Sequence, residues 1–232
     1  MDNWRPFRAL SPPDRPAERE GGGAMRRIEN ADDLAEGTAW LSAREPRFAP
    51  LLARVGPLPL RRAAPGFGYM IEAVVSQQVS LASARAIGGR LKEAGITTEA
   101  AVIAAGAEGL RACGLSRPKI TSLLALAGAG VDWAGLDARP DDDLVRHLDA
   151  LPGIGRWTAE LYGLTALGRP DLFPAGDLAL QKAAAHLFDL PERPDERALR
   201  ALAEPWSPWR AVAARALWAY IRIISGREGG GT

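Results

Sequence analysis

Residues 151–159 have the sequence Leu-Pro-Gly-Ile-Gly-Arg-Trp-Thr-Ala, and the rest of the chain is arranged around them. An acidic helix is predicted over 141–150 and an apolar helix from Arg156 to about Gly168. Glycine allows a positive φ and the close approach of another backbone, and the N–H groups that open a helix favour an anion. The stretch therefore predicts a helix–hairpin–helix that holds one phosphate of a nucleic-acid backbone. The alternative is an ordinary turn with a glycine cap.

A second feature follows the hairpin. Asp177 lies twenty-two positions after Gly155, where the loop Phe-Pro-Ala-Gly over 173–176 ends and a new helix begins. Aspartate is a favoured N-cap, so its position alone requires no catalytic role. The hairpin and Asp177 at this spacing together resemble the helix-hairpin-helix (HhH-GPD) DNA glycosylase superfamily, and above all its DNA-3-methyladenine glycosylase II branch. The resemblance covers roughly residues 66–225.

The composition limits the classes of protein and of site. The chain has 232 residues, 47% hydrophobic and 25% charged, with a formal net charge of +1, so DNA binding would need a local basic face and main-chain donors. The single cysteine, Cys113, excludes an intramolecular disulfide and the four-cysteine iron–sulfur cluster of the endonuclease III branch. Two distant histidines predict no metal site. No apolar run approaches the about 20 residues of a membrane span, and the first residues lack a signal peptide's apolar core, so we expect a cytoplasmic protein.

The hydrophobic pattern predicts an all-α fold with no sizeable sheet, because apolar residues recur at helical spacing and only 58–62 is a short strand candidate. Residues 1–24 are rich in Pro, Arg and Glu and predict a flexible leader, and 227–232 a loose tail. The resemblance implies two helical lobes flanking a DNA-binding cleft. One lobe would join 25–55 with 170–226, and the other, 56–169, would contain the hairpin at about 141–168.

Two further stretches are candidates for DNA contact. The buried helix predicted over 67–79 ends in Gln77 and Gln78, which is either a polar last turn or, as the resemblance implies, the part that enters the minor groove and fills the gap left by an extruded base. Arg117 and Lys119 stand at the start of another helix, where its dipole does not favour cations. A phosphate partner would explain them, and so would ordinary solvation.

The resemblance also implies a role for each site residue. Asp177 would stabilise the oxocarbenium character of the sugar and orient or deprotonate the attacking water. Trp157 and Trp218, with Tyr162 nearby, would line the pocket for the flipped base, because an electron-deficient alkylated base stacks well on an indole. The phosphate anchor would consist of Gly153, Ile154, Gly155 and Arg156.

Trp157 stands where bifunctional members of the superfamily carry their Schiff-base lysine, so we expect a monofunctional enzyme that leaves an abasic site. Some 3-methyladenine enzymes have an aromatic residue at the position of Leu161, which leaves the preferred lesion open. The expected partner is double-stranded DNA containing damaged bases, bound by a monomer. No cofactor is expected beyond a monovalent cation that the hairpin could hold. The alternatives are a glycosylase for uracil or another deaminated base, and a non-catalytic hairpin DNA-binding module.

Overall fold

The computed structural model describes residues 26–228, and its regular elements are all helical. The bounds are α1 Ala31–Arg44, α2 Phe48–Val55, α3 Phe67–Ser76, α4 Leu81–Glu93, α5 Glu99–Ala112, α6 Arg117–Ala127, α7 Asp141–Asp149, α8 Arg156–Leu161, α9 Leu178–Leu187, α10 Glu196–Ala203 and α11 Arg210–Glu228. A π-helical turn, Tyr162–Ala166, extends α8, and two short 3₁₀ turns lie at Gly135–Ala138 and Glu204–Trp206. The all-α prediction is confirmed, and the segment 58–62 forms no strand.

The predicted termini are only partly covered. The leader over 1–24 and the residues 229–232 lie outside the described residues. The last helix continues to Glu228, and the loose tail over 227–232 stays a prediction. No helix between residues 26 and 228 is both long and apolar enough to cross a membrane.

Local chemistry explains where the helices begin. Asn30 caps α1 in a capping box with Asp33, and the hydroxyls of Ser80 and Thr98 cap α4 and α5. The sequence predicted two short helices over 97–113. They are joined into α5 with a kink at Gly106, whose φ of 57° is the conformation that glycine adopts at least cost.

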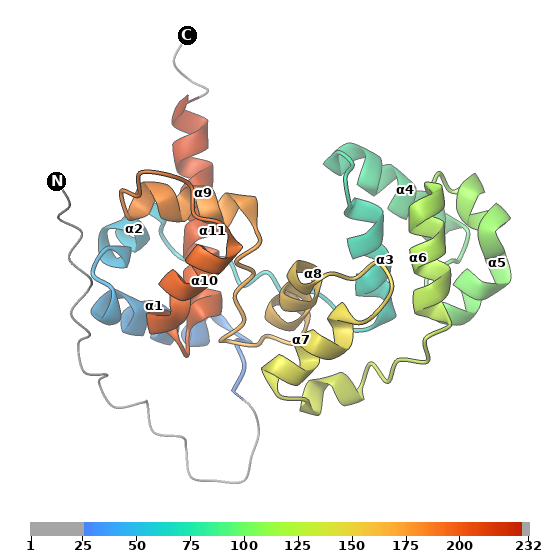
Figure 1. The fold of residues 1–232 in the computed structure, drawn as a ribbon, viewed down its shortest axis with the longest axis horizontal. Coiled ribbons are helices and arrows are strands. Elements are labelled where there is room, and N and C mark those ends of the chain that lie inside the picture. The colour runs from blue at the N-terminus through green and yellow to red at the C-terminus, as the bar shows by residue number, and fades with distance from the viewer. Residues whose placement is uncertain (1–25, 229–232) are drawn as a thin grey trace.

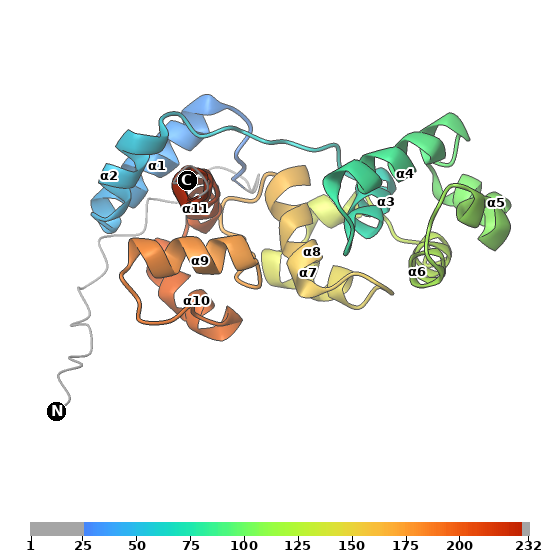
Figure 2. The ribbon, with the colours of Figure 1, turned by 90° about the horizontal axis from the view of Figure 1, so that it is seen from above.

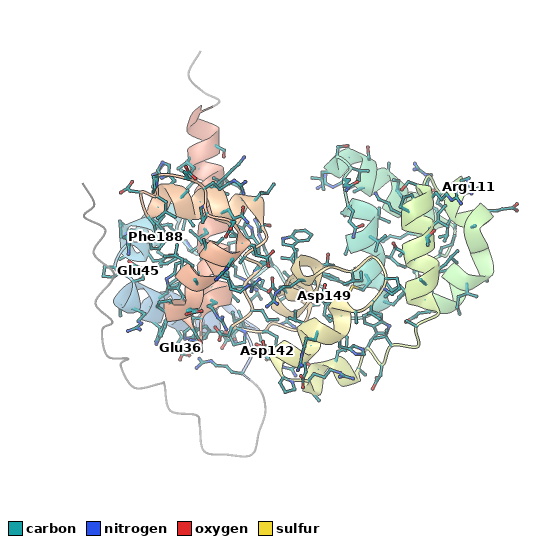
Figure 3. All side chains as sticks on the ribbon, viewed as in Figure 1. Glu36, Glu45, Arg111, Asp142, Asp149 and Phe188 are labelled. Carbon is teal, nitrogen blue, oxygen red and sulfur yellow. The ribbon has the colours of Figure 1, made fainter. Side chains whose placement is uncertain are left out.

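The helices gather in two groups. In Figure 1, α1, α2, α9, α10 and α11 lie together on one side and α3 to α6 on the other, with α7 and α8 between them; the view from above in Figure 2 shows the same order. The first group packs around an aromatic cluster in which Phe188, labelled in Figure 3, stacks on Trp206 with ring centroids 5.6 Å apart. Phe48 meets Trp206 edge-on. The hairpin helices therefore stand where the two groups meet.

Arginines hold the chain where it passes between the groups. Arg215 on α11 is 2% exposed and donates to the carbonyls of Leu60 and Leu164. Arg169 is fully buried and donates to the carbonyls of Asp137 and Arg139. A buried guanidinium is costly unless its N–H groups are paired. Nη2 of Arg169 is paired in this way, whereas its Nε and Nη1 make no hydrogen bond and Nη1 lies 3.5 Å from Asp141 Oδ1. Burial lowers the pKa of Arg215 to about 10.

Candidate functional site

The turn between α7 and α8 is a tight hairpin that only particular residues can form. Gly153 has a φ of +78°, and a Cβ there would collide with the side chain of Ser122 on α6, so glycine is required by both conformation and space. Ile154 is 3% exposed and anchors the turn in the core, while its N–H donates to the Leu151 carbonyl at 3.1 Å. The prediction that Ile154 contacts DNA can therefore concern only its main chain.

The hairpin presents unpaired main-chain donors. Among the described residues, the N–H groups of Gly153 and Gly155 have no hydrogen-bond partner, and no side chain caps α8. Arg156, the first residue of α8, is half-exposed and pairs with Glu160 at 3.0 Å. Free N–H groups at the start of a helix are the donors that an anion requires.

Gln77 links the hairpin to the end of α3. Its side-chain amide donates to the Gly153 carbonyl at 3.0 Å. The next residue, Gln78, is exposed and has a φ of +54°, which is unusual for a residue other than glycine. Gln77 therefore holds the hairpin, while Gln78 is exposed at the bend and lines the same cavity as Trp157.

Asp177 is the N-cap of α9. Its Oδ1 accepts the N–H groups of Ala179 and Leu180 at 2.8 and 3.0 Å. The loop before it is held by Gln181, whose amide donates to the Ala175 carbonyl at 2.9 Å. The cap and this contact together orient the carboxylate, leaving Oδ2 directed away from the helix end.

Trp157, on the helix between the two groups, meets Asp177, which caps a helix of the first group. The indole Nε1 donates to Asp177 Oδ2 at 3.2 Å across twenty residues of sequence. Trp157 is 42% exposed, which is a high exposed fraction for a tryptophan. An exposed indole beside an oriented carboxylate offers one stacking surface and one negative charge at a single place.

A cavity of about 540 Å³ opens beside Trp157. Its walls come from the outer face of α3, the residues after it, and α8, and the volume falls within the range of small-molecule sites. The lining residues are Ala63, Tyr69, Glu72, Ala73, Ser76, Gln77, Gln78, Trp157, Thr158 and Leu161.

The arrangement matches a known family. The family model described as "HhH-GPD superfamily base excision DNA repair protein" matches residues 71–208, a span that includes the hairpin, Trp157 and Asp177. The chain belongs to the HhH-GPD superfamily.

Relatives within the HhH-GPD superfamily agree over most of the chain. DNA-3-methyladenine glycosylase 1 of Schizosaccharomyces pombe is 33% identical over 160 residues, which cover 64% of this chain and 69% of that protein. The structure of S. pombe 3-methyladenine DNA glycosylase (Mag1) in complex with abasic DNA has 30% identity and a TM-score of 0.69, covering 79% of this chain and 95% of that one. The DNA-3-methyladenine glycosidase of Bacillus halodurans has 26% identity and a TM-score of 0.73, covering 82% and 91%.

Two of the residues predicted for the HhH-GPD site lie elsewhere. Tyr162 is fully buried, and its hydroxyl accepts the Gly66 N–H at 3.0 Å, so the prediction that it lines an open pocket is wrong. Burial raises the pKa of this phenol. Lys119 is 9% exposed, and its ammonium donates to the Val75 carbonyl at the end of α3 at 2.7 Å. The prediction that Lys119 faces a phosphate is therefore at odds with its burial, which also lowers the pKa of its ammonium.

Two other predicted residues, Trp218 and Arg117, make no contact with Trp157 or Asp177. Trp218 is half-buried on α11 against the core and does not line the cavity beside Trp157. Arg117 is exposed at the first position of α6, in a second glycine turn. Their expected roles in base binding and DNA contact stay predictions.

Tyr69 and Glu72 line the cavity wall but are not among the site residues predicted from the sequence. Tyr69 is packed edge-on against Tyr162 with ring centroids 5.2 Å apart, and burial is the main cause that raises the pKa of its phenol. A signal was present, because Tyr69, Glu72 and Ser76 recur at i, i+3 and i+7 opposite the apolar stripe of α3. Within residues 26–228, no group of three or more His, Cys, Asp and Glu side chains could hold a metal ion.

Proposed function

We propose that this protein is a monofunctional DNA glycosylase that removes alkylated bases of the 3-methyladenine type from duplex DNA during base-excision repair. The observation that carries the proposal is the hydrogen bond between Asp177 and Trp157, whose indole lines a cavity beside the end of α3. The names of the relatives, which include DNA-3-methyladenine glycosylase 1, support the substrate class. A hairpin that only bound DNA would need neither an exposed indole nor an oriented carboxylate.

The geometry supports a division of labour between the two groups of helices. The Gly153 and Gly155 N–H groups hold one phosphate, which sets the register of the duplex. Gln78, at the bend after α3, occupies the space that the extruded base leaves in the stack. The groups 25–55 with 170–226 and 56–169 act as lobes on either side of the bound DNA.

The flipped base stacks on the exposed face of Trp157. Asp177 Oδ1 is committed to capping α9, so Oδ2 is the oxygen that turns toward the sugar. As the C1′–N bond breaks, its electron pair leaves with the base and positive charge develops on the sugar, where the carboxylate stabilises it. The oxygen of a water molecule then adds to C1′ and loses its proton, with Asp177 as the nearby base. The products are the free base and an abasic site.

The proposal excludes backbone cleavage, because the position of the Schiff-base lysine is occupied by Trp157. Borohydride added during the reaction should therefore trap no covalent protein–DNA complex. A trapped complex would show that the enzyme also cleaves the backbone, but it would not contradict the release of the base.

The proposal is tested by release of free bases from methylated duplex DNA in a buffer containing EDTA, since it includes no metal or other cofactor. Release of 3-methyladenine and 7-methylguanine is the expected result. Release of uracil or hypoxanthine alone would favour the deaminated-base alternative, and binding without any release would favour the DNA-binding module. A monomeric state and a cytoplasmic location stay predictions from the sequence.

A further inference from the structure

Glu72 is the charged residue in the wall of the cavity beside Trp157. The other described lining residues are apolar, amide, hydroxyl or aromatic, so no lysine or arginine offsets its charge within the wall. Glu72 lies on the face of α3 that points away from the core. Tyr69 and Ser76, one turn before and one turn after it on this helix, line the same wall. Asp177 accepts the indole N–H of Trp157, so two carboxylates belong to the surroundings of this side chain.

The partners of Glu72 leave its carboxylate available. Among the described residues its ion-pair partner is Lys92 on α4, at 3.2 Å, and both side chains are about two-thirds exposed, at 67% and 68%. Pairs this exposed contribute little and exchange readily with water. Lys92 lines a second cavity between α3 and α4, of about 760 Å³, which shares Tyr69, Glu72 and Ser76 with the cavity beside Trp157, but Lys92 does not line the latter. Glu72 also acts on Tyr69, where its charge adds to burial in raising the pKa of the phenol.

Alkylation of a purine at a ring nitrogen that has no proton to lose leaves a fixed positive charge on the base. A deaminated base such as hypoxanthine is neutral. A carboxylate in the wall attracts the first kind of base and offers little to the second, and the attraction grows as the entering base displaces water from the cavity. We propose that Glu72 is a specificity-determining residue that selects cationic alkylated bases over neutral ones, an inference that rests on the proposed glycosylase function.

Glu72 and Asp177 act at different stages of the reaction. While the base is bound and the C1′–N bond is intact, the positive charge lies on the base, close to Glu72. When the bond breaks, the electron pair neutralises the base and the positive charge passes to the sugar, close to Asp177. Glu72 therefore stabilises the bound state more than the transition state, and its contribution appears in KM and not in kcat.

The test compares Glu72→Gln with wild type on two duplexes, one carrying a single 7-methylguanine and one a single hypoxanthine. Glutamine keeps the size of the side chain and removes the charge. The expected result is a KM about five- to tenfold higher for the 7-methylguanine duplex, an unchanged or higher kcat, and an unchanged KM for hypoxanthine. Glu93→Gln is the matched control, since Glu93 is exposed at the end of α4, lines neither cavity and carries the same charge.

Equal changes on the two duplexes, or no change on either, would overturn the inference. So would a fall in kcat on both duplexes at constant KM, which would mean that Glu72 only supports the fold of the wall. These results are distinct from failure of the proposed function. If wild type releases no 7-methylguanine, the proposed function fails and the selectivity of Glu72 falls with it. If wild type releases 7-methylguanine and Glu72→Gln keeps its preference, only the inference about Glu72 fails.

Discussion

The chain contains two glycine turns that begin a helix in nearly the same way. In the turn between α5 and α6, Gly114 has a φ of +91°, Leu115 is buried, and Arg117 is the first helical residue. The hairpin between α7 and α8 repeats this pattern: a glycine with positive φ, then a buried aliphatic residue, then an arginine as first helical residue. Sequence alone does not separate the two turns.

The hydrogen bonds separate them. The Gly114 N–H donates to the Arg111 carbonyl at 2.8 Å, and Arg90 donates to the Cys113 carbonyl at 2.7 Å, so at the two equivalent positions of the first turn only the Ser116 N–H has no partner among the described residues. In the hairpin, the N–H groups of Gly153 and Gly155 have no partner among the described residues. A phosphate site is thus identified by the donors that a turn leaves unused, and not by its glycines.

The largest effect should come from Asp177, which contacts the second hairpin helix through Trp157 and has no counterpart at the α5–α6 turn. Asp177→Asn keeps a side chain that can cap α9 but removes the charge, and the rate of base release should fall about 10²- to 10³-fold. Asp195→Asn is the control, because Asp195 caps α10 in the same manner, with Oδ1 accepting the Ala198 N–H at 2.7 Å. Release rates under single-turnover conditions measure both. Equal losses would show that capping, and not charge at the sugar, is what matters.

A leucine at the equivalent position of each turn should separate them by DNA affinity. Gly155 and Ser116 both precede the first helical residue in an extended conformation, and a Cβ at Gly155 would meet nothing within 4 Å. Gly155→Leu should fold normally but cover the free donors, weakening binding to an abasic-site duplex about ten- to hundredfold. Ser116→Leu should leave the affinity within about twofold. Fluorescence anisotropy at one fixed salt concentration measures the dissociation constants, and similar losses would make the two turns equivalent.

The smallest effect should be a change in salt dependence within the α5–α6 turn. Arg117→Ala should reduce the slope of log affinity against log salt by about 1, as expected for loss of one phosphate contact. Lys119→Met should leave the slope unchanged, because the ammonium of Lys119 is already buried against the Val75 carbonyl. Titrations at several salt concentrations give the slopes. A reduced slope for Lys119→Met would restore the original prediction for that residue.

The sequence predicted the hairpin, the Asp177 loop and the helical class because each depends on local signals: glycine conformation, N-cap chemistry and apolar spacing. It did not predict which residues at the end of α8 face the cavity. Leu161 and Tyr162 are adjacent and both largely apolar, so hydrophobicity could not show that Leu161 lines the cavity and Tyr162 the core. The prediction for Lys119 failed for a related reason. A lysine is expected at the surface, and the sequence could not show that the Val75 carbonyl would accept a hydrogen bond from its ammonium in the interior.

The arginines between the two groups of helices have a consequence for how the chain can vary. Arg62, Arg169 and Arg215 all donate to main-chain carbonyls, among them those of Ile28, Ala166 and Leu164. A carbonyl is supplied by any residue, so the accepting positions can change identity while the contact persists. Substitutions at the accepting positions can therefore leave these contacts intact, whereas loss of any of the three arginines removes the contacts that it makes.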